Sequence, residues 1–185
     1  AVLSGIADPD KYPAIFKVLQ AQEYSSPYME KYVMEALFKM GQGKYAMERL
    51  QKRIAPMVEN KEYPTLFEFW DAHKRNFRGG SSNHAWSGGG LTVICQKLMG
   101  AEVIEPAWRK FKIDPQYVVF NEAELTFPTL SGTVKTSFKK NATALVMTVG
   151  VPAGSEALVY IPSAETDKIT LDGTALPASK VVTDG

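Results

Sequence analysis

The spacing at which apolar residues recur changes near residue 100, and this change constrains the fold more than any other feature of the sequence. Before it, from Met29 to Met40, apolar residues follow helical spacing. After it, from Val134 to Phe138, they alternate with polar residues. A period near 3.6 is typical of helices and a period of two is typical of strands. We therefore predict an α+β fold with a helical domain over residues 1–100 and a β domain over residues 101–185.

Boundary signals predict four helices in the first domain. Ser26 and Pro27 are typical of a helix start, and Gly41 is typical of a helix end. The other expected helices start at Asp8–Pro9, run from about Lys44 to Val58, and follow the glycine- and serine-rich residues 79–82 to end at Gly100. Helix pairs joined by short links are typical of an α-helical array.

The alternation after residue 100 predicts several short strands. Residues 134–138, 145–151 and 157–161 each place apolar side chains on one face. Asp172-Gly173 is a strong signal for a tight hairpin. Many short strands separated by turns indicate an antiparallel β-sandwich.

The composition gives no support to nucleic-acid or membrane partners. The 185 residues carry a formal net charge of +1, from 21 basic and 20 acidic side chains, whereas nucleic-acid binding favours a basic surface. No apolar run approaches the roughly 20 residues that a membrane helix needs. With two histidines and one cysteine, Cys95, a structural zinc site is not expected, and no cofactor is predicted.

Glu68 is the first candidate for chemistry, because it lies in an aromatic stretch of the sequence. Its neighbours include Phe67, Phe69 and Trp70. A carboxyl group among aromatic rings is partly desolvated, which suits acid–base work. The alternative is that the three rings belong to the core and Glu68 is an exposed residue between them. Composition alone favours this alternative.

His84 is the second candidate, because it opens the fourth predicted helix. Ser82 or Asn83 is expected to cap that helix. A histidine at a helix start can point into a cleft and donate hydrogen bonds, but taken alone His84 is better explained by capping or packing. The glycines at 88–90 lower helix stability, so close helix packing or the approach of a substrate is expected to offset them.

The ordered set of motifs resembles the bacterial α-L-rhamnosidases of glycoside hydrolase family 78. Residues 65–71, Thr-Leu-Phe-Glu-Phe-Trp-Asp, resemble the family's "T-x-W-E-x-W-D" stretch. Residues 82–90, Ser-Asn-His-Ala-Trp-Ser-Gly-Gly-Gly, resemble its "S-x-N/C-H-x-W-x-x-G" helix start. Residues 26–37 resemble an inner helix, and residues 100–115 resemble the crossing into a C-terminal β domain.

The resemblance implies a C-terminal fragment of a larger enzyme. Residues 1–100 would hold the last helices of an (α/α)6 barrel, and residues 101–185 would form the C-terminal β-sandwich. The upstream part of the same polypeptide is then an expected partner, together with a rhamnose-containing glycoside or polysaccharide. The fragment alone is expected to be inactive, because four helices cannot close a barrel.

The resemblance also implies the roles of individual residues in an inverting hydrolase. Glu68 matches the general base, and His84 matches a histidine that contacts the sugar. Trp70, Asn83 and Trp86 lie in the same motifs and are expected to bind substrate. The general acid has no counterpart in this chain and is expected upstream. The family commonly has tryptophan at the position of Phe67. This departure means that the resemblance does not define the detailed shape of the sugar subsite.

Two other readings remain open at this point. The second hypothesis is another (α/α) glycoside hydrolase or phosphorylase that acts on a different sugar. The third is a non-catalytic carbohydrate-binding module, whose β region offers Trp108, Tyr117 and Phe127 for stacking on sugar. The ordinary interpretation of these three residues is core, and we favour it.

Overall fold

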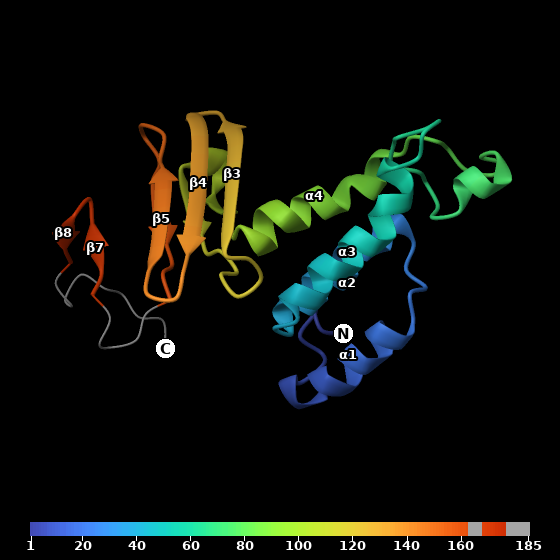
Figure 1. The fold of residues 1–185 in the computed structure, drawn as a ribbon, viewed down its shortest axis with the longest axis horizontal. Helices are drawn as coiled ribbons and strands as arrows, with labels where there is room; N and C mark the ends of the chain where they lie inside the picture. Colours follow the sequence, from blue (N-terminus) through green and yellow to red (C-terminus); the bar gives the residue numbers. More distant parts are fainter. Residues whose placement is uncertain (163–167, 177–185) are drawn as a thin grey trace.

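The computed structural model describes residues 1–162 and 168–176, in which helices precede strands (Figure 1). The helical elements are η1 Pro9–Lys11, α1 Tyr12–Ala21, α2 Pro27–Lys39, α3 Gly43–Val58, η2 Ala72–Arg75, η3 Ala85–Gly88, α4 Gly89–Val93, η4 Ile94–Leu98 and η5 Pro106–Trp108. The strands are β1 Glu102–Glu105, β2 Lys110–Ile113, β3 Glu122–Thr129, β4 Gly132–Lys140, β5 Leu145–Gly150, β6 Glu156–Val159, β7 Thr170–Leu171 and β8 Thr174–Ala175. The predicted α+β class is confirmed.

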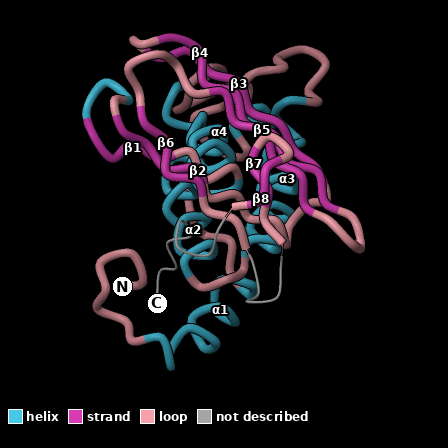
Figure 2. Tube along the Cα trace, turned by 90° about the vertical axis from the view of Figure 1, so that its left-hand side faces the viewer, coloured by secondary structure: helices cyan, strands magenta, loops and turns pink. Residues whose placement is uncertain are grey.

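The two kinds of structure lie on opposite sides of Figure 1, joined by the segment from α4 to η4. Figure 2 looks from the side of the strands, with the helices behind them. The division into two domains at residue 100 stays a prediction. Its second part includes residues 163–167 and 177–185, which lie outside the described residues.

The predicted boundaries of α2 are confirmed at both ends. Ser26 accepts a hydrogen bond from the backbone N–H of Met29 at 3.3 Å, which satisfies one of the free donors of the first turn. Gly41 has a φ of +73°, and its N–H donates to the Phe38 carbonyl. The N–H of the next residue donates to the Leu37 carbonyl, so the helix ends in a Schellman motif.

The helical core lies between α1, α2 and α3. Leu37 and Ala46 are fully buried there, and Ile15 and Phe16 of α1 pack against the cluster that includes them. A second cluster joins Met34 of α2 to other buried residues of α3 and α4. The amphipathic faces predicted from helical spacing therefore meet one another.

The fourth predicted helix is more irregular than expected. It consists of a 3-10 turn (η3), a single α-helical turn (α4) and a π-helical segment (η4), and Gly100 follows with a φ of +64°. The expectation that Ser82 or Asn83 caps it was wrong. His84 occupies the N-cap position, and its side chain makes no capping hydrogen bond.

The glycines of this helix permit close helix packing, which was one of the two expected explanations for their presence. A side chain at Gly89 would begin 2.7 Å from Cβ of Lys31, and one at Gly90 would begin 2.8 Å from Cδ1 of Leu50. Cβ of Lys31 is fixed by the backbone, so the close approach of α4 to α2 depends on the missing Cβ at Gly89, whereas the end of the Leu50 side chain could shift.

The strands form three sheets in the described part of the chain. β3, β4 and β5 form an antiparallel sheet, and β7 and β8 form the hairpin predicted at Asp172-Gly173, whose φ angles are +49° and +77°. The third sheet has the order β1-β2-β6, and β2 pairs with β6 in parallel. The prediction of a purely antiparallel arrangement was therefore wrong at this pair, because the chain passes through β3–β5 before it returns.

The two larger sheets share one buried cluster. Phe111 and Ile113 of β2 pack with Val134 of β4, and all three are fully buried. Trp108 and Phe127 pack against the same cluster, with ring centroids 4.6 Å apart. Tyr117 is 7% exposed in a neighbouring cluster. The interpretation of Trp108, Tyr117 and Phe127 as core residues is thus confirmed.

Candidate active site

The two segments that carry the predicted site residues are joined by backbone hydrogen bonds. The N–H of Glu68 donates to the Ser81 carbonyl at 3.1 Å, and the N–H of His84 donates to the Leu66 carbonyl at 2.7 Å. This pairing brings positions 68 and 84 together although the chain makes an excursion between them.

The excursion reverses direction after η2. Asn76 and Phe77 have φ angles of +46° and +56°, a region that asparagine tolerates and phenylalanine rarely adopts. Packing offsets the strain at Phe77, whose ring centroid lies 4.9 Å from that of Tyr63 and 5.2 Å from that of Phe67. The contacts of the Phe77 ring with Tyr63 and Phe67 therefore hold the chain reversal against the core.

The carboxylate of Glu68 is held by a neighbouring serine and lies beside His84. Its Oε2 accepts from the backbone N–H of Ser81 at 2.9 Å and from the Ser81 hydroxyl at 3.2 Å. The same hydroxyl lies 2.8 Å from Nδ1 of His84, and Nδ1 lies 3.5 Å from Oε2. The Glu68 side chain is 21% exposed and the His84 side chain 31%. A fixed, partly solvated carboxylate of this kind can accept a proton from a bound water.

Ser81 is a member of this cluster that sequence reasoning missed. It was placed only in the glycine- and serine-rich link at residues 79–82. The sequence places Ser81 three residues before His84, which could have suggested a contact between the two side chains. In a loop, however, a spacing of three residues does not determine which side chains meet. Its bridging position depends on the pairing with Glu68, which is not local in sequence.

The aromatic residues around Glu68 lie in or against one buried cluster. Phe67 is fully buried and packs with Met57 and Ala72, so its ring belongs to the core. Phe69 and Trp70 are partly buried and pack against this cluster, and the Phe69 ring also lies against Gly80, where a Cβ would be 2.9 Å from it. The departure from the family motif at Phe67 thus falls at a core position.

The three other predicted binding residues have different surroundings. Trp86 is 41% exposed, and its ring centroid lies 4.0 Å from that of His84. Asn83 is exposed beside them in sequence. Trp70 points elsewhere: its Nε1–H donates to the Ser25 carbonyl at 2.7 Å, and the guanidinium of Arg53 lies 4.2 Å from its ring centroid. His84 and Trp86 therefore join the Glu68 cluster, whereas Trp70 is engaged with a buried ionic network.

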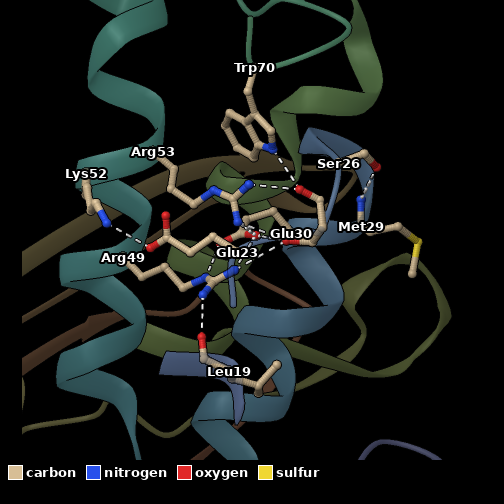
Figure 3. A network of polar contacts seen from close by, with 10 residues as sticks. Leu19, Glu23, Ser26, Met29, Glu30, Arg49, Lys52, Arg53 and Trp70 are labelled. Carbon is tan, nitrogen blue, oxygen red and sulfur yellow. Dashed lines mark hydrogen bonds and ion pairs between the residues drawn. The ribbon is translucent and has the colours of Figure 1, made fainter. Parts of the chain in front are cut away.

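That network is centred on Glu30, which is 2% exposed (Figure 3). Arg49 Nε donates to Oε1 of Glu30 at 2.5 Å, and Arg53 Nη1 donates to Oε2 at 2.9 Å. Ser25 also donates to this carboxylate. Arg49 reaches the Leu19 carbonyl at 2.8 Å, so the network joins α1, α2, α3 and, through Ser25, the segment between α1 and α2. Burial lowers the pKa of Arg53, whereas for Arg49 the bonds to Glu30 outweigh burial and raise the pKa.

An apolar groove of about 720 Å³ lies between α3 and the end of the helical region. Met47 and Ile54 line it from α3, and Leu91 and Ile94 line it from α4 and η4. Neither Glu68 nor His84 contributes to this groove, so it is separate from the candidate site.

Two other kinds of site are absent from residues 1–162 and 168–176. No helix there is long and apolar enough to cross a bilayer. Nor do three or more histidine, cysteine, aspartate or glutamate side chains gather there in a way that would hold a metal ion.

Comparison with known families identifies the second half of the chain. Residues 100–175 match the model of the bacterial alpha-L-rhamnosidase C-terminal domain. This part of the chain is related to the bacterial α-L-rhamnosidases. The resemblance expected from the sequence motifs is thus confirmed. No curated protein matches the chain.

Solved α-L-rhamnosidase structures extend the likeness over most of the chain. The enzyme from Dictyoglumus thermophilum matches 83% of this chain at 22% identity and a TM-score of 0.69. The Streptomyces avermitilis enzyme, solved in complex with L-rhamnose, matches 90% at 22% identity and a TM-score of 0.69. The family 78 rhamnosidase of Bacillus sp. GL1 matches 88% at 24% identity and a TM-score of 0.70. At these identities the likeness shows a shared fold. The chain spans 18% of the length of each of these three proteins.

Proposed function

We propose that this chain forms part of an inverting glycoside hydrolase that releases terminal α-L-rhamnose, with Glu68 as its general base. The observation that carries the proposal is the hydrogen-bonded cluster of Glu68, Ser81 and His84. It combines a fixed carboxylate with a histidine 3.5 Å away on a partly exposed surface. The solved structure of a related protein with L-rhamnose supports the choice of sugar.

In this mechanism Glu68 removes a proton from a water molecule. The water oxygen forms a bond to the anomeric carbon as the bond from that carbon to the leaving oxygen breaks. A carboxylic acid on the opposite face of the sugar protonates the leaving oxygen. In inverting glycosidases the two carboxyl groups lie about 6.5–9.5 Å apart, which leaves room for the water. We place this acid on an upstream part of the polypeptide, whose helices would complete an (α/α)6 barrel.

The neighbouring side chains have separate roles in the proposal. His84 hydrogen-bonds a hydroxyl of the sugar through the ring nitrogen that does not face Ser81. Trp86 offers an exposed ring next to His84, and Asn83 adds polar contacts at the edge of the site. Trp70 has no direct role in this proposal, because its indole N–H donates to the Ser25 carbonyl and Arg53 stacks on its ring. The strands are proposed to form the β-sandwich that follows the barrel.

The test uses the whole polypeptide that contains this chain. An aryl α-L-rhamnoside should be hydrolysed, and proton NMR should show β-L-rhamnose as the first product, since inversion changes the anomeric configuration. A panel of aryl glycosides of other sugars separates a rhamnosidase from another hydrolase of similar fold. Faster cleavage of a different sugar, or α-L-rhamnose as the first product, would overturn the corresponding part of the proposal. The chain alone should show no appreciable hydrolysis.

A further inference from the structure

A row of four aromatic rings leads away from the Glu68 cluster across the surface. It begins at His84, whose ring centroid lies 4.0 Å from that of Trp86. Trp86 in turn lies 5.5 Å from Tyr28, and Tyr28 lies 5.9 Å from Tyr32. The row is continuous although its first two members belong to the start of η3 and its last two to α2.

The fold accounts for this alignment. Tyr28 and Tyr32 are four residues apart on α2, so they lie on the same face of that helix. Trp86 reaches Tyr28 because the chain at Gly89 passes against Lys31, where a Cβ would have no room. The row thus depends on the close packing of α2 against the helix that begins after His84.

These rings combine apolar faces with polar groups at the surface. Trp86, Tyr28 and Tyr32 are 41%, 43% and 36% exposed, although each carries a large apolar side chain. The hydroxyls of Tyr28 and Tyr32 lie 3.5 Å apart, and Nζ of Lys31 lies 5.1 Å from the Tyr32 ring centroid. A pyranose ring has the complementary character, with C–H groups on its faces and hydroxyls around its edge. Tyrosine and tryptophan suit such a ligand because one part of each side chain is apolar and another can hydrogen-bond.

We propose that Trp86, Tyr28 and Tyr32 form a binding subsite for the neutral sugar unit that is linked to the terminal rhamnose. The proposal rests on the proposed function, because the Glu68 end of the row is taken as the place where the terminal sugar is cleaved. The row extends beyond His84 by three rings, so it offers contact area for a second sugar unit next to the terminal one.

Ligand-observed saturation-transfer NMR on the whole polypeptide tests the subsite without requiring cleavage. The two probes are L-rhamnose and a rhamnosyl-glucose disaccharide, measured with Glu68→Gln as the background so that neither is consumed. Tyr32→Ala should weaken disaccharide binding roughly three- to tenfold, the range expected for loss of one aromatic contact, and leave L-rhamnose binding unchanged. Alanine suits a helical position, so α2 should persist. Tyr32→Phe retains the ring and should bind within about twofold of the parent.

Tyr24→Ala is the matched control, because Tyr24 is 88% exposed and precedes α2. It should bind both probes as the parent does. Equal weakening of both probes by Tyr32→Ala, or no saturation transfer to the disaccharide, overturns the subsite. Unchanged disaccharide binding together with a lowered Tm overturns it as well, since Tyr32 would then pack against other parts of the polypeptide.

The outcomes also separate the subsite from the proposed function. If the unsubstituted polypeptide cleaves no rhamnoside but disaccharide binding in the Glu68→Gln background depends on Tyr32, the hydrolase proposal fails and the subsite stands. If the unsubstituted polypeptide cleaves rhamnosides and Tyr32→Ala in the Glu68→Gln background binds the disaccharide normally, the subsite fails alone.

Discussion

Nδ1 of His84 lies 3.5 Å from Oε2 of Glu68, and the hydroxyl of Ser81 lies within hydrogen-bond distance of both atoms. The hydroxyl has one proton to donate, so its partners compete for it. When that proton goes to Glu68, the neutral imidazole carries its own proton on Nδ1 and donates it to the Ser81 oxygen. The outer nitrogen of His84 is then an acceptor, which suits a sugar hydroxyl that donates.

The first prediction concerns Glu68→Gln in the whole polypeptide. The amide keeps the shape of the side chain but cannot accept the proton from water, so kcat should fall about 10²- to 10⁴-fold. Sugar binding, measured by calorimetry, should change little. His84→Ala provides the contrast: it should raise KM as well as lower kcat, because it removes a contact that is also made before the reaction. A Glu68→Gln enzyme with near-normal kcat would refute the assignment of the base.

The second prediction concerns Ser81→Ala. This change removes the hydroxyl that bridges Glu68 and His84 but leaves the backbone N–H that donates to Glu68. Loss of the hydroxyl should lower kcat/KM about tenfold, since a hydrogen bond to a charged group contributes about 1.5–3 kcal/mol and one of the two donors remains. Ser81→Thr should restore most of the activity. The adjacent Ser82→Ala is the control, and an equal loss in that variant would argue against a specific role for Ser81.

The third prediction concerns Glu30→Gln and the free energy of unfolding. The amide leaves the guanidinium groups of Arg49 and Arg53 without their buried countercharge. The free energy of unfolding should therefore fall by about 3–5 kcal/mol. Urea denaturation of the 185-residue chain measures this change. Glu23→Gln is the matched control, because Glu23 pairs with the exposed Lys52 at 2.9 Å. Such a pair contributes at most about 1 kcal/mol. Similar losses in the two variants would contradict the special position of Glu30.

The fourth prediction concerns Tyr117 and alkaline pH. Burial, with a smaller effect of Asp114, raises the pKa of Tyr117 to about 12, from an ordinary value of 10. The folded chain therefore holds this proton more tightly than the unfolded chain does. The resulting stability, about 2–3 kcal/mol, is fully present below pH 10 and is lost as the pH rises through 12.

Denaturation at several pH values tests this. Tyr117→Phe should be less stable than the parent at pH 8 by about 1 kcal/mol, because it lacks the hydrogen bond to the Tyr160 carbonyl, but should lose less stability between pH 10 and 12. If the free energies of unfolding of the two proteins fell in parallel between pH 10 and 12, Tyr117 would not contribute to the loss of stability at alkaline pH.

Local sequence signals predicted much of the fold. Ser26 and Gly41 marked the ends of α2 because capping and positive φ depend on single residues. Asp172-Gly173 marked its hairpin for the same reason. The alternation of Val134 and Phe138 predicted the buried face of β4, which both residues occupy.

Features that depend on distant contacts were not predictable in this way. The parallel pairing of β2 with β6 joins segments separated by a whole sheet, and no local pattern specifies such a partner. Trp70 was grouped with the site through its motif, yet its indole N–H contacts Ser25, which lies on another segment. The proximity of Glu68 and His84 was anticipated only through the resemblance to a family, because spacing along the chain says nothing about that pairing.

The close contact between Gly89 and Lys31 limits how this chain could be engineered for stability. Replacing a helical glycine with alanine ordinarily stabilises a helix by about 1 kcal/mol, and a designer would choose this position early. Here the added methyl group would meet backbone-proximal atoms of Lys31 at 2.7 Å, which a side-chain rotation cannot relieve. The helices would have to separate, and Trp86 would move away from Tyr28. Gly89→Ala is therefore expected to lower stability and to disturb the proposed subsite together, so stabilising changes belong elsewhere.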